Sequence, residues 1–484
     1  MAVSLLDLGV LATYLAGVVL FGIWVGRAQK GAADYMLGDR NIPWWGLLFS
    51  IVATETSTVT FLSIPGFAWS RDLTWIQLAV GFMLGRFLVI AFLLPHYFKG
   101  EYFTAYEVLN ERFGGAVRRT ASFLFLATRS LADGLRLFLT AIVVQELSGV
   151  SLPTAVALVG VTTIVYTFVG GMKAVVWTDV AQFAIYTVGA AVAFGLLVSR
   201  LPGGWEELVA TATAGGKLRW LDLTPTLTDP YVLWAGLVGG TFLTFGSHGA
   251  DQLMVQRYLC ARSRRQAAWA LGASGGVVLA QFAFFLLIGV GLFAFYKAFP
   301  PAIPFDRPDR VFARFIVDEL PRGVVGLVIG AIFAAAMSTL SSSLNSSATA
   351  ATSDFYRPLR PHATPQRLLR TTRLFTLFFG LVQVGVALAG PLLSRTVVEA
   401  VLTIAGFTTG ITLGVFFLGL FTRRVDSRAA LAGLLLGLLL MIGVAFGTRL
   451  AWPWYTLVGS SATFGFGLLA SLARPAPRDL PAGQ

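Results

Sequence analysis

The sequence predicts an all-α protein that crosses a membrane many times, and three observations support this fold class. Of its 484 residues, 56% are hydrophobic and only 12% are charged, whereas soluble domains carry about 25% charged residues. The mean hydropathy is +0.75. Apolar stretches long enough to cross a bilayer, which takes about 20 residues, recur from one end of the chain to the other.

Thirteen such stretches follow one another along the chain. The first lacks the basic start and the small-residue cleavage site of a secretory signal, so we expect it to remain as a helix. The lone cysteine, Cys260, excludes an internal disulfide and a cysteine metal cluster. The candidate transmembrane helices are residues 5–25, 44–69, 74–98, 120–147, 151–170, 174–199, 231–255, 266–296, 323–352, 370–394, 397–421, 428–447 and 452–472.

Two of these stretches are interrupted. Residues 44–69 contain "ATETSTVTFLSIPG", and residues 231–255 contain "GLVGGTFLTFGSHGAD". Freed backbone groups are tolerated in a membrane only around a protein-lined cavity, and broken helices at matching positions in two halves are typical of a transporter's central site. These are the second and seventh stretches, so the spacing favours a five-plus-five inverted repeat.

This repeat divides the chain into six parts. They are a leading helix and cytoplasmic loop (1–43), a first five-helix repeat (44–199), an extracellular loop (200–230), a second five-helix repeat (231–421), two trailing helices (422–473) and a cytoplasmic tail (474–484).

The net charge of +12 sets the orientation rather than indicating a nucleic-acid partner. With the N-terminus outside, 22 of the 36 Lys and Arg lie on the cytoplasmic side, 11 lie outside, and Arg86, Arg129 and Arg136 lie within helices. Cytoplasmic loops of membrane proteins carry this excess of basic residues. We therefore expect a multi-pass protein of the plasma membrane with a cytoplasmic C-terminus, and no nucleic-acid or obligatory protein partner.

Hydroxyl groups are concentrated in one otherwise apolar helix. Residues 338–353 include ten Ser or Thr and one Asn, and Ser338, Ser342, Asn345 and Thr349 fall on one helical face. Helix packing uses small and hydroxyl residues, but a cluster of this size favours an ion site. Neutral oxygens with one or two carboxylates suit a monovalent hard cation, and sodium is the natural candidate. The other ligands are expected from "ATETST".

Three of the acidic residues within the predicted helices, Glu55, Asp133 and Asp179, are candidates for a function. Asp133 has Arg129 four residues before it and Arg136 three residues after it, so a structural ion pair is the alternative to a substrate role. Asp179 lies near the start of the stretch 174–199, and Glu55 has no local cation. Glu55 therefore requires a bound ion, a proton or a distant partner.

Two basic residues within the predicted helices carry less information. His248 is more typical of a satisfied polar residue than of a metal ligand, because no second ligand stands at helical spacing. Arg86 is expected to snorkel or to pair with an acid.

Four segments resemble one known family when taken together in order. They are "DYMLGDRNIPWW" at 34–45, "GGMKAVVWTDVAQ" at 170–182, "ADQLMVQRYLCAR" at 250–262 and "MSTLSSSLNSSATAATSDFY" at 337–356. They resemble the sodium:solute symporter family, which includes sodium-coupled glucose, galactose, proline, sialic acid, iodide and monocarboxylate carriers. The resemblance covers nearly the whole chain and implies a LeuT-type five-plus-five core and alternating access.

The resemblance also implies binding residues. The main sodium site would use Ala53, Thr56, Ala335, Ser338 and Thr339. A second sodium or coupling site would use Ser341, Ser342, Asp179 and Glu55. Substrate contacts would come from Ser57, Thr60, Gln77, Asp133 and Asp251.

The function predicted from these residues is sodium-coupled symport of a small organic solute, not enzymatic catalysis. The solute class stays open between a sugar, a carboxylate and an amino acid. "RSLAD" at 129–133 looks like the sugar carriers, whereas "AYEVLNERFG" at 105–114 is similar to the monocarboxylate and sialic acid carriers. A transporter-like membrane sensor and a proton-coupled carrier are the alternatives.

Overall fold

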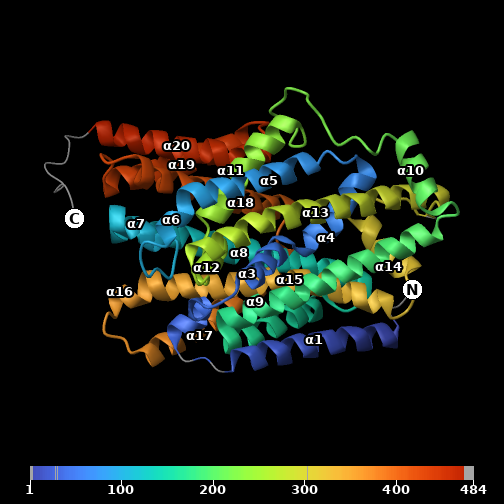
Figure 1. Cartoon of the computed structure of the whole chain (residues 1–484), viewed down its shortest axis with the longest axis horizontal. Helices are drawn as coiled ribbons and strands as arrows, with labels where there is room; N and C mark the ends of the chain where they lie inside the picture. The colour runs from blue at the N-terminus through green and yellow to red at the C-terminus, as the bar shows by residue number, and fades with distance from the viewer. Residues whose placement is uncertain (1–3, 28, 30, 302, 474–484) are drawn as a thin grey trace.

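The computed structural model describes residues 4–27, 29, 31–301 and 303–473, and these are helical with short connections. Within these ranges no β-strand forms, and Ile42 and Ala261 make an isolated bridge. Most long helices run along the long axis of the molecule (Figure 1). The chain begins at one end of this axis and finishes at the other (Figure 1).

The first part of the chain runs to the connection after residue 214. Its elements are α1 (Leu5–Gly26), α2 (Ala32–Leu37), η1 (Gly38–Arg40), α3 (Trp44–Glu55), α4 (Thr58–Ser70), α5 (Ile76–Leu88), η2 (Val89–Leu93), α6 (Leu94–Tyr97), α7 (Tyr106–Phe113), α8 (Gly115–Ser148), α9 (Leu152–Arg200) and α10 (Gly204–Ala214).

The second part contains the remaining helices. They are η3 (Ala235–Gly239), α11 (Gly240–Gly249), α12 (Gln252–Leu259), α13 (Arg264–Ala298), α14 (Arg310–Glu319), α15 (Val324–Ala350), η4 (Ala351–Tyr356), α16 (Arg357–Leu359), α17 (Pro365–Ala389), η5 (Gly390–Leu392), α18 (Arg395–Phe421), α19 (Ser427–Gly447), η6 (Trp452–Trp454) and α20 (Tyr455–Leu472). All thirteen predicted stretches are therefore helical over most of their length.

Helix length and composition identify most of the membrane spans. Within the described residues, nine helices are long and apolar enough to cross a membrane, or ten if α3 and α4, which meet at a 60° bend, form one span. The predicted count of thirteen treats α9 as two spans and adds the more polar α8 and the segment from η3 to α12. That count stays a prediction.

α9 changes direction at Gly171. A straight helix of its 49 residues would measure about 74 Å, more than twice the hydrocarbon core of about 30 Å. Gly171 has φ 53° and ψ −150°, which breaks the helix. Gly170 meets Gly26 at the end of α1, while Gln182, further along α9, reaches back to Tyr14 in the middle of α1. The two halves of α9 therefore run in opposite directions, as the predicted stretches 151–170 and 174–199 require.

The two predicted interruptions are present, each slightly displaced from its most obvious residues. The first break lies at Thr56 and Ser57, which are extended. Pro65 lies inside α4, because the Ser57 hydroxyl accepts a hydrogen bond from the Thr60 amide and starts a new helix before the proline is reached. The second break follows the glycines, at Ala250 and Asp251.

α15 forms the centre of the bundle. It is packed between α9, α1, α3 and α17 (Figure 1), and its residues from Ser341 to Ala350 are all buried. The hydroxyl cluster of the sequence therefore faces protein and not lipid.

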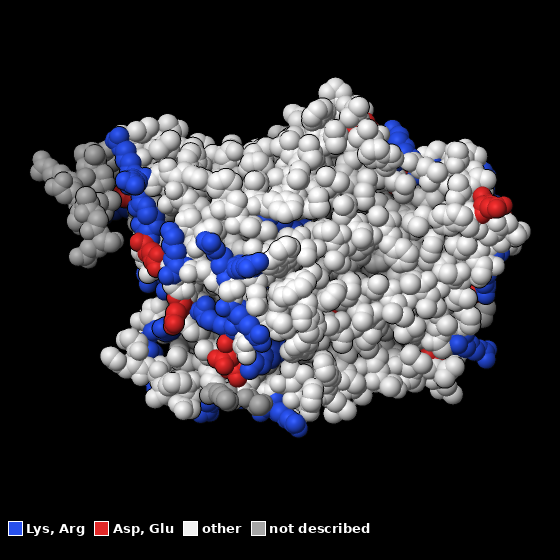
Figure 2. Space-filling model, in the orientation of Figure 1, with Lys and Arg blue, Asp and Glu red and all other residues white. Residues whose placement is uncertain are grey.

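On the surface of the bundle, charged residues gather towards the two ends (Figure 2). On the face in Figure 2, Lys and Arg gather at the end that carries α7, α16 and the last turn of α20. A broad band with almost no charge separates them from the opposite end (Figure 2). Such a band is what a bilayer requires of the surface that it covers.

Candidate ion and solute site

The break between α3 and α4 lies directly against α15. The Thr339 hydroxyl is 3.2 Å from the carbonyl oxygen of Thr54, and the Thr58 hydroxyl is 3.2 Å from that of Ile332. The last-turn carbonyls of α3 have no helical donor ahead of them. Thr339 of α15 lies where the carbonyl of Thr54 points.

The structure brings the five residues expected for the main sodium site to this junction. Ala53, Ala335 and Ser338 are fully buried, and Thr56 is 2% exposed. The Thr339 hydroxyl lies between the two helices, since it is also 3.4 Å from the carbonyl of Ala335. Backbone and hydroxyl oxygens are ligands suited to a hard monovalent cation.

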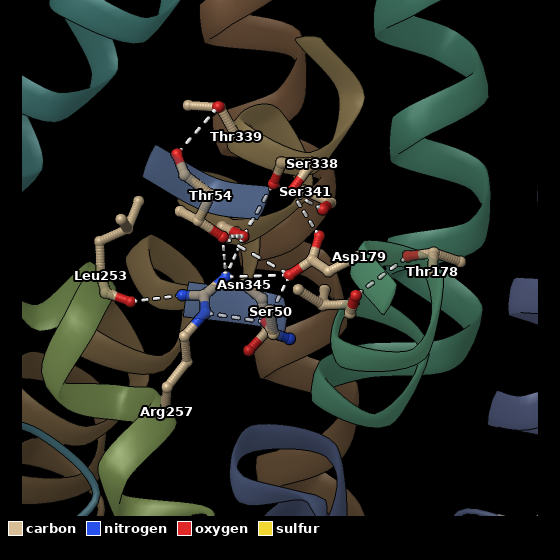
Figure 3. Close-up of polar contacts among 12 residues, drawn as sticks. Ser50, Thr54, Thr178, Asp179, Leu253, Arg257, Ser338, Thr339, Ser341 and Asn345 are labelled. Atoms are coloured by element: carbon tan, nitrogen blue, oxygen red, sulfur yellow. Dashed lines mark hydrogen bonds and ion pairs between the residues drawn. The ribbon is translucent and has the colours of Figure 1, made fainter. Parts of the chain in front are cut away.

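A second polar cluster surrounds Asp179 on α9, which is fully buried (Figure 3). Its Oδ1 accepts from the Ser338 hydroxyl at 2.7 Å, and its Oδ2 accepts from the Ser50 hydroxyl at 2.5 Å. Ser341 and Ser342, expected in the same site, each donate to the carbonyl of Ser338, at 3.1 and 2.8 Å.

The sequence analysis missed one member of this cluster, Arg257 on α12. Its Nη2 lies 3.2 Å from Asp179 Oδ2 and also donates to the hydroxyls of Thr54 and Ser342 (Figure 3). Its Nε donates to Ser50 at 2.9 Å.

Arg257 lies inside the bundle and not in a solvent-exposed loop, because its side chain is only 1% exposed. Two glutamines of α12, Gln252 and Gln256, are just as buried. Three polar residues in an eight-residue helix were the signal that could have revealed a buried polar surface.

Glu55, at the end of α3, has partners of its own. It pairs with Arg86 of α5, and its Oε1 lies 3.2 Å from His248 Nε2. Arg86 is fully buried and also donates to Ser274 and to the carbonyl of Phe82, at 3.1 and 2.9 Å. The distant partner that the sequence required for Glu55 is thus a buried arginine, and within the described part of the chain no hydrogen bond or ion pair joins Glu55 to Asp179.

A cavity of about 470 Å³ opens beside these clusters. Ser57, Thr60 and Asp251, all expected at the substrate site, line its wall. Arg129 of α8 also lines it and pairs with Asp251 across the cavity.

Asp133 lies behind this wall. Its Oδ1 is 2.5 Å from Arg136 Nη1 and 3.6 Å from Arg129 Nη1, so both ion pairs expected from the sequence form. Arg136 itself faces the cavity, and 40% of its side chain is exposed.

Gln77 forms hydrogen bonds with the connection between α10 and η3 and does not contribute to the cavity wall. Its amide nitrogen donates to the carbonyls of Thr74 and Tyr231, and its oxygen accepts from the amide of Asp222 at 3.2 Å. Gln77 is not among the residues that line the cavity.

The model of the sodium:solute symporter family matches residues 35–437 of the chain. The chain belongs to this family. The sodium/sialic acid symporter SiaT of Proteus mirabilis is 30% identical, with 97% of this chain and 96% of that protein covered. The sodium/sialic acid symporter NanT of Aliivibrio fischeri is 31% identical, with 95% of this chain and 92% of that protein covered. The human sodium/iodide cotransporter is 30% identical, with 92% of this chain and 70% of that protein covered.

Solved structures agree with this assignment. A sodium-coupled sialic acid symporter in a substrate-bound, outward-open state matches with a TM-score of 0.87 and 29% identity, covering 99% of this chain and all of that one. The nucleobase-cation-symport-1 transporter Mhp1 matches with a TM-score of 0.57 at 14% identity, covering 91% of this chain and 94% of that one, which shows the fold alone.

The symporter therefore has the LeuT-type helical fold that its sequence predicts. It is a multi-pass membrane protein that couples the transport of a solute to sodium, as its relatives do. The predicted family, fold class, function and ion are confirmed. Family and relatives are transporters, not enzymes.

Proposed function

We propose that this symporter carries a small organic anion, whose carboxylate is bound by Arg136, together with two sodium ions. The observation that carries the proposal is the exposure of Arg136 in the cavity. Its Nη1 is held by Asp133 at 2.5 Å, yet 40% of the side chain is exposed. A guanidinium offers a planar fork of donors that matches a carboxylate, and one nitrogen in an ion pair leaves the others for a ligand.

The relatives support an anionic solute. Two of those described above are named for sialic acid and one for iodide, and all of these solutes are anions at neutral pH. Ser57 and Thr60 line the same cavity and would bind further polar groups of the solute.

The first sodium ion is assigned to Ala53, Thr56, Ala335, Ser338 and Thr339. The support is the contact of Thr339 with carbonyls of both α3 and α15, at 3.2 and 3.4 Å. A cation that replaces this hydroxyl contact would join the two helices. The second ion is assigned to Asp179 with Ser338, Ser341 and Ser342, which supply a carboxylate and three hydroxyls within one buried cluster.

We infer the same topology as from the sequence, with the N-terminus outside and the C-terminus in the cytoplasm of a plasma-membrane protein. The support is the gathering of Lys and Arg at one end of the bundle (Figure 2), which by the positive-inside rule faces the cytoplasm. Thirteen spans in a five-plus-five repeat then rock between outward-open and inward-open states, and sodium favours the outward-open one.

Thermal unfolding of the purified protein tests the solute class. A carboxylate solute such as sialic acid is expected to raise the apparent melting temperature in sodium but not in potassium, because a ligand of the native state stabilises that state. Its methyl ester is expected to have no effect. Arg136→Gln should weaken binding at least about tenfold, or about 1.4 kcal/mol.

Arg119→Gln provides the control, because Arg119 is exposed on the same helix, α8. A second candidate is a neutral sugar, since Asp133 already neutralises Arg136. Stabilisation by neutral sugars that persists in Arg136→Gln would favour that candidate and contradict the anion.

A further inference from the structure

The short helix α12 connects the ion cluster to the solute cavity. Near its end, Arg257 contacts Asp179 of α9 and Ser342 of α15. At its start, Asp251 caps the helix through the Leu253 amide at 2.9 Å and pairs with Arg129 across the cavity. Leu253 itself also lines the cavity. One rigid element of eight residues therefore touches both sites.

Arg257 occupies the oxygens that a second sodium ion requires. Its Nη2 donates to Ser342 and lies 3.2 Å from Asp179 Oδ2, while Nε donates to Ser50 at 2.9 Å (Figure 3). The Ser342 hydroxyl already uses its proton on the carbonyl of Ser338, at 2.8 Å. The hydroxyl oxygen of Ser342 can still accept a hydrogen bond, and it accepts one from the guanidinium of Arg257.

Because both are positively charged, a sodium ion and the guanidinium of Arg257 compete for Asp179. In the described ranges, Asp179 is the single carboxylate paired with Arg257, and both side chains are at most 1% exposed. A sodium ion and a guanidinium held together at one carboxylate would leave a net positive charge in a buried site, which is strongly disfavoured. Sodium can take Asp179 only when the guanidinium moves away.

We propose that Arg257 is an internal counter-cation that sodium displaces from Asp179 and Ser342, and that this displacement transmits sodium occupancy to the solute cavity through α12. The inference rests on the second sodium ion of the proposed function. Arg257 Nη1 is also held by the carbonyl of Leu253 at 2.6 Å, so the guanidinium is tied to its own helix at the residue that lines the cavity. Releasing the other end of this side chain removes the ion pair that joins α12 to α9 and one of the hydrogen bonds that join it to α15, where Gln256 stays bound to Asn345 and Thr349.

Hydrogen exchange of the wild-type protein tests the first step without any substitution. In solute-free samples, replacing potassium by sodium should speed amide exchange in residues 252–259 several-fold, because the anchor on Asp179 and Ser342 is lost. Adding solute should restore protection. If exchange in this segment is unchanged or slowed by sodium alone, the displacement does not occur.

Substitution of Arg257 tests the coupling. In Arg257→Gln the competitor is gone, so the sodium concentration for half-maximal binding should fall at least threefold, while the gain in solute affinity that sodium causes should drop below twofold. Arg257→Lys keeps the charge without the fork of donors and should give intermediate values. Arg262→Gln is the control, because Arg262 is an exposed arginine in the connection that follows α12. This variant should match the wild type in both measurements.

The remaining outcomes also decide between explanations. A higher sodium requirement in Arg257→Gln, or sodium coupling equal to that of the wild type, would show that Arg257 only builds the site. If Arg257→Gln does not fold, the exchange measurement on the wild type decides alone. Sodium that neither binds nor stabilises the wild-type protein would contradict the proposed function and this inference with it, whereas sodium that binds without changing the exchange of residues 252–259 would contradict this inference alone.

Discussion

Ser338 and Thr339 are neighbours on α15, yet their hydroxyls serve different helices. Ser338 donates to Asp179 on α9 at 2.7 Å, whereas Thr339 lies 3.2 Å from a carbonyl of α3. A cation at the α3–α15 junction would bind oxygens that are already gathered there. Serine and threonine hydroxyls in helices often bond only to their own backbone, so these two are distinguished by their contacts with other helices.

Removing the Ser338 hydroxyl should therefore weaken sodium binding more than it weakens the fold. We expect Ser338→Ala to raise the sodium concentration for half-maximal transport about tenfold, the equivalent of about 1.4 kcal/mol. Ser346→Ala is the control, because the hydroxyl of Ser346 bonds to the carbonyl of Ser343 in its own helix. Sodium titrations of solute uptake into proteoliposomes measure both. Equal sodium dependence in Ser338→Ala and the wild type would remove Ser338 from the site.

The sequence predicted the residues that a local pattern can reveal. The hydroxyl cluster stands out because its members lie within 16 consecutive residues. The two arginines that pair with Asp133 lie about one helical turn before and after it in the sequence. The pair of Glu55 with Arg86 joins residues 31 apart, and Arg257 meets Asp179 across 78 residues. Such pairs depend on how helices pack, which periodicity does not specify.

Among the helices, α9 shows how a single glycine can separate two spans. Gly171 has φ 53°, and a Cβ added there would lie 2.6 Å from the carbonyl oxygen of Tyr35. Both the backbone and the space require glycine. Hydropathy placed the boundary between two predicted stretches at residues 171–173. Only the structure shows that, within α9, the non-helical backbone conformation is confined to Gly171.

Gly171→Ala should destabilise the protein by about 1–3 kcal/mol from backbone strain alone, and more where the contact with Tyr35 cannot relax. Gly195→Ala provides a matched control in the same helix, because nothing lies within 4 Å of its added Cβ. That substitution should be neutral or slightly stabilising, by up to about 1 kcal/mol. Thermal unfolding in detergent compares them, and similar melting temperatures for the two variants would contradict the turn at Gly171.

A carboxylate stabilises the connection between α4 and α5. Asp72 is 6% exposed and accepts from the amide and the hydroxyl of Thr74, at 3.0 and 2.6 Å, and from Arg219 at 2.9 Å. Burial by itself would raise the pKa of Asp72, but the hydrogen bonds from Thr74 and Arg219 and the charge of Arg219 outweigh it and lower the pKa.

A lowered pKa in the folded state means that the unfolded state binds the proton more readily. The stabilisation by Asp72 is then fully present at neutral pH and is lost as the pH falls below about 4. We expect the wild type to lose stability more steeply between pH 5 and pH 3 than Asp72→Asn, with a difference of at most about 1 kcal/mol at pH 7 because Arg219 is half exposed. Glu206→Gln, which changes an exposed acid of α10, should follow the wild type. Parallel pH profiles for the wild type and Asp72→Asn would show that this carboxylate does not hold the connection.

At the scale of the whole molecule, the break in α3, the buried surface of α15 and the position of α12 form one continuous polar region through an otherwise apolar bundle. The sequence predicted the region from two interrupted stretches and one hydroxyl-rich helix. It left Arg86 open between snorkelling and pairing with an acid, and it did not predict that Arg257 neutralises Asp179 inside this region. The positive charges of Arg86 and Arg257 determine how many sodium ions the bundle can bind.

Charge balance makes the membrane potential a measure of that number. One sodium ion with a monovalent anion is electroneutral, whereas two sodium ions with the same anion carry one net charge inward. One charge moving across 100 mV contributes about 2.3 kcal/mol, and at 1.4 kcal/mol per decade this is roughly 1.7 decades of accumulation, or about 50-fold. Because Asp179 offers a second site, we expect a potential of −100 mV inside proteoliposomes to raise solute accumulation by about this factor at equal sodium concentrations. Asp179→Asn should abolish the effect of voltage while leaving uptake dependent on sodium through the junction of α3 and α15. Accumulation by the wild type that ignores the potential would mean that a single ion accompanies each anion, and that Arg257 never leaves Asp179.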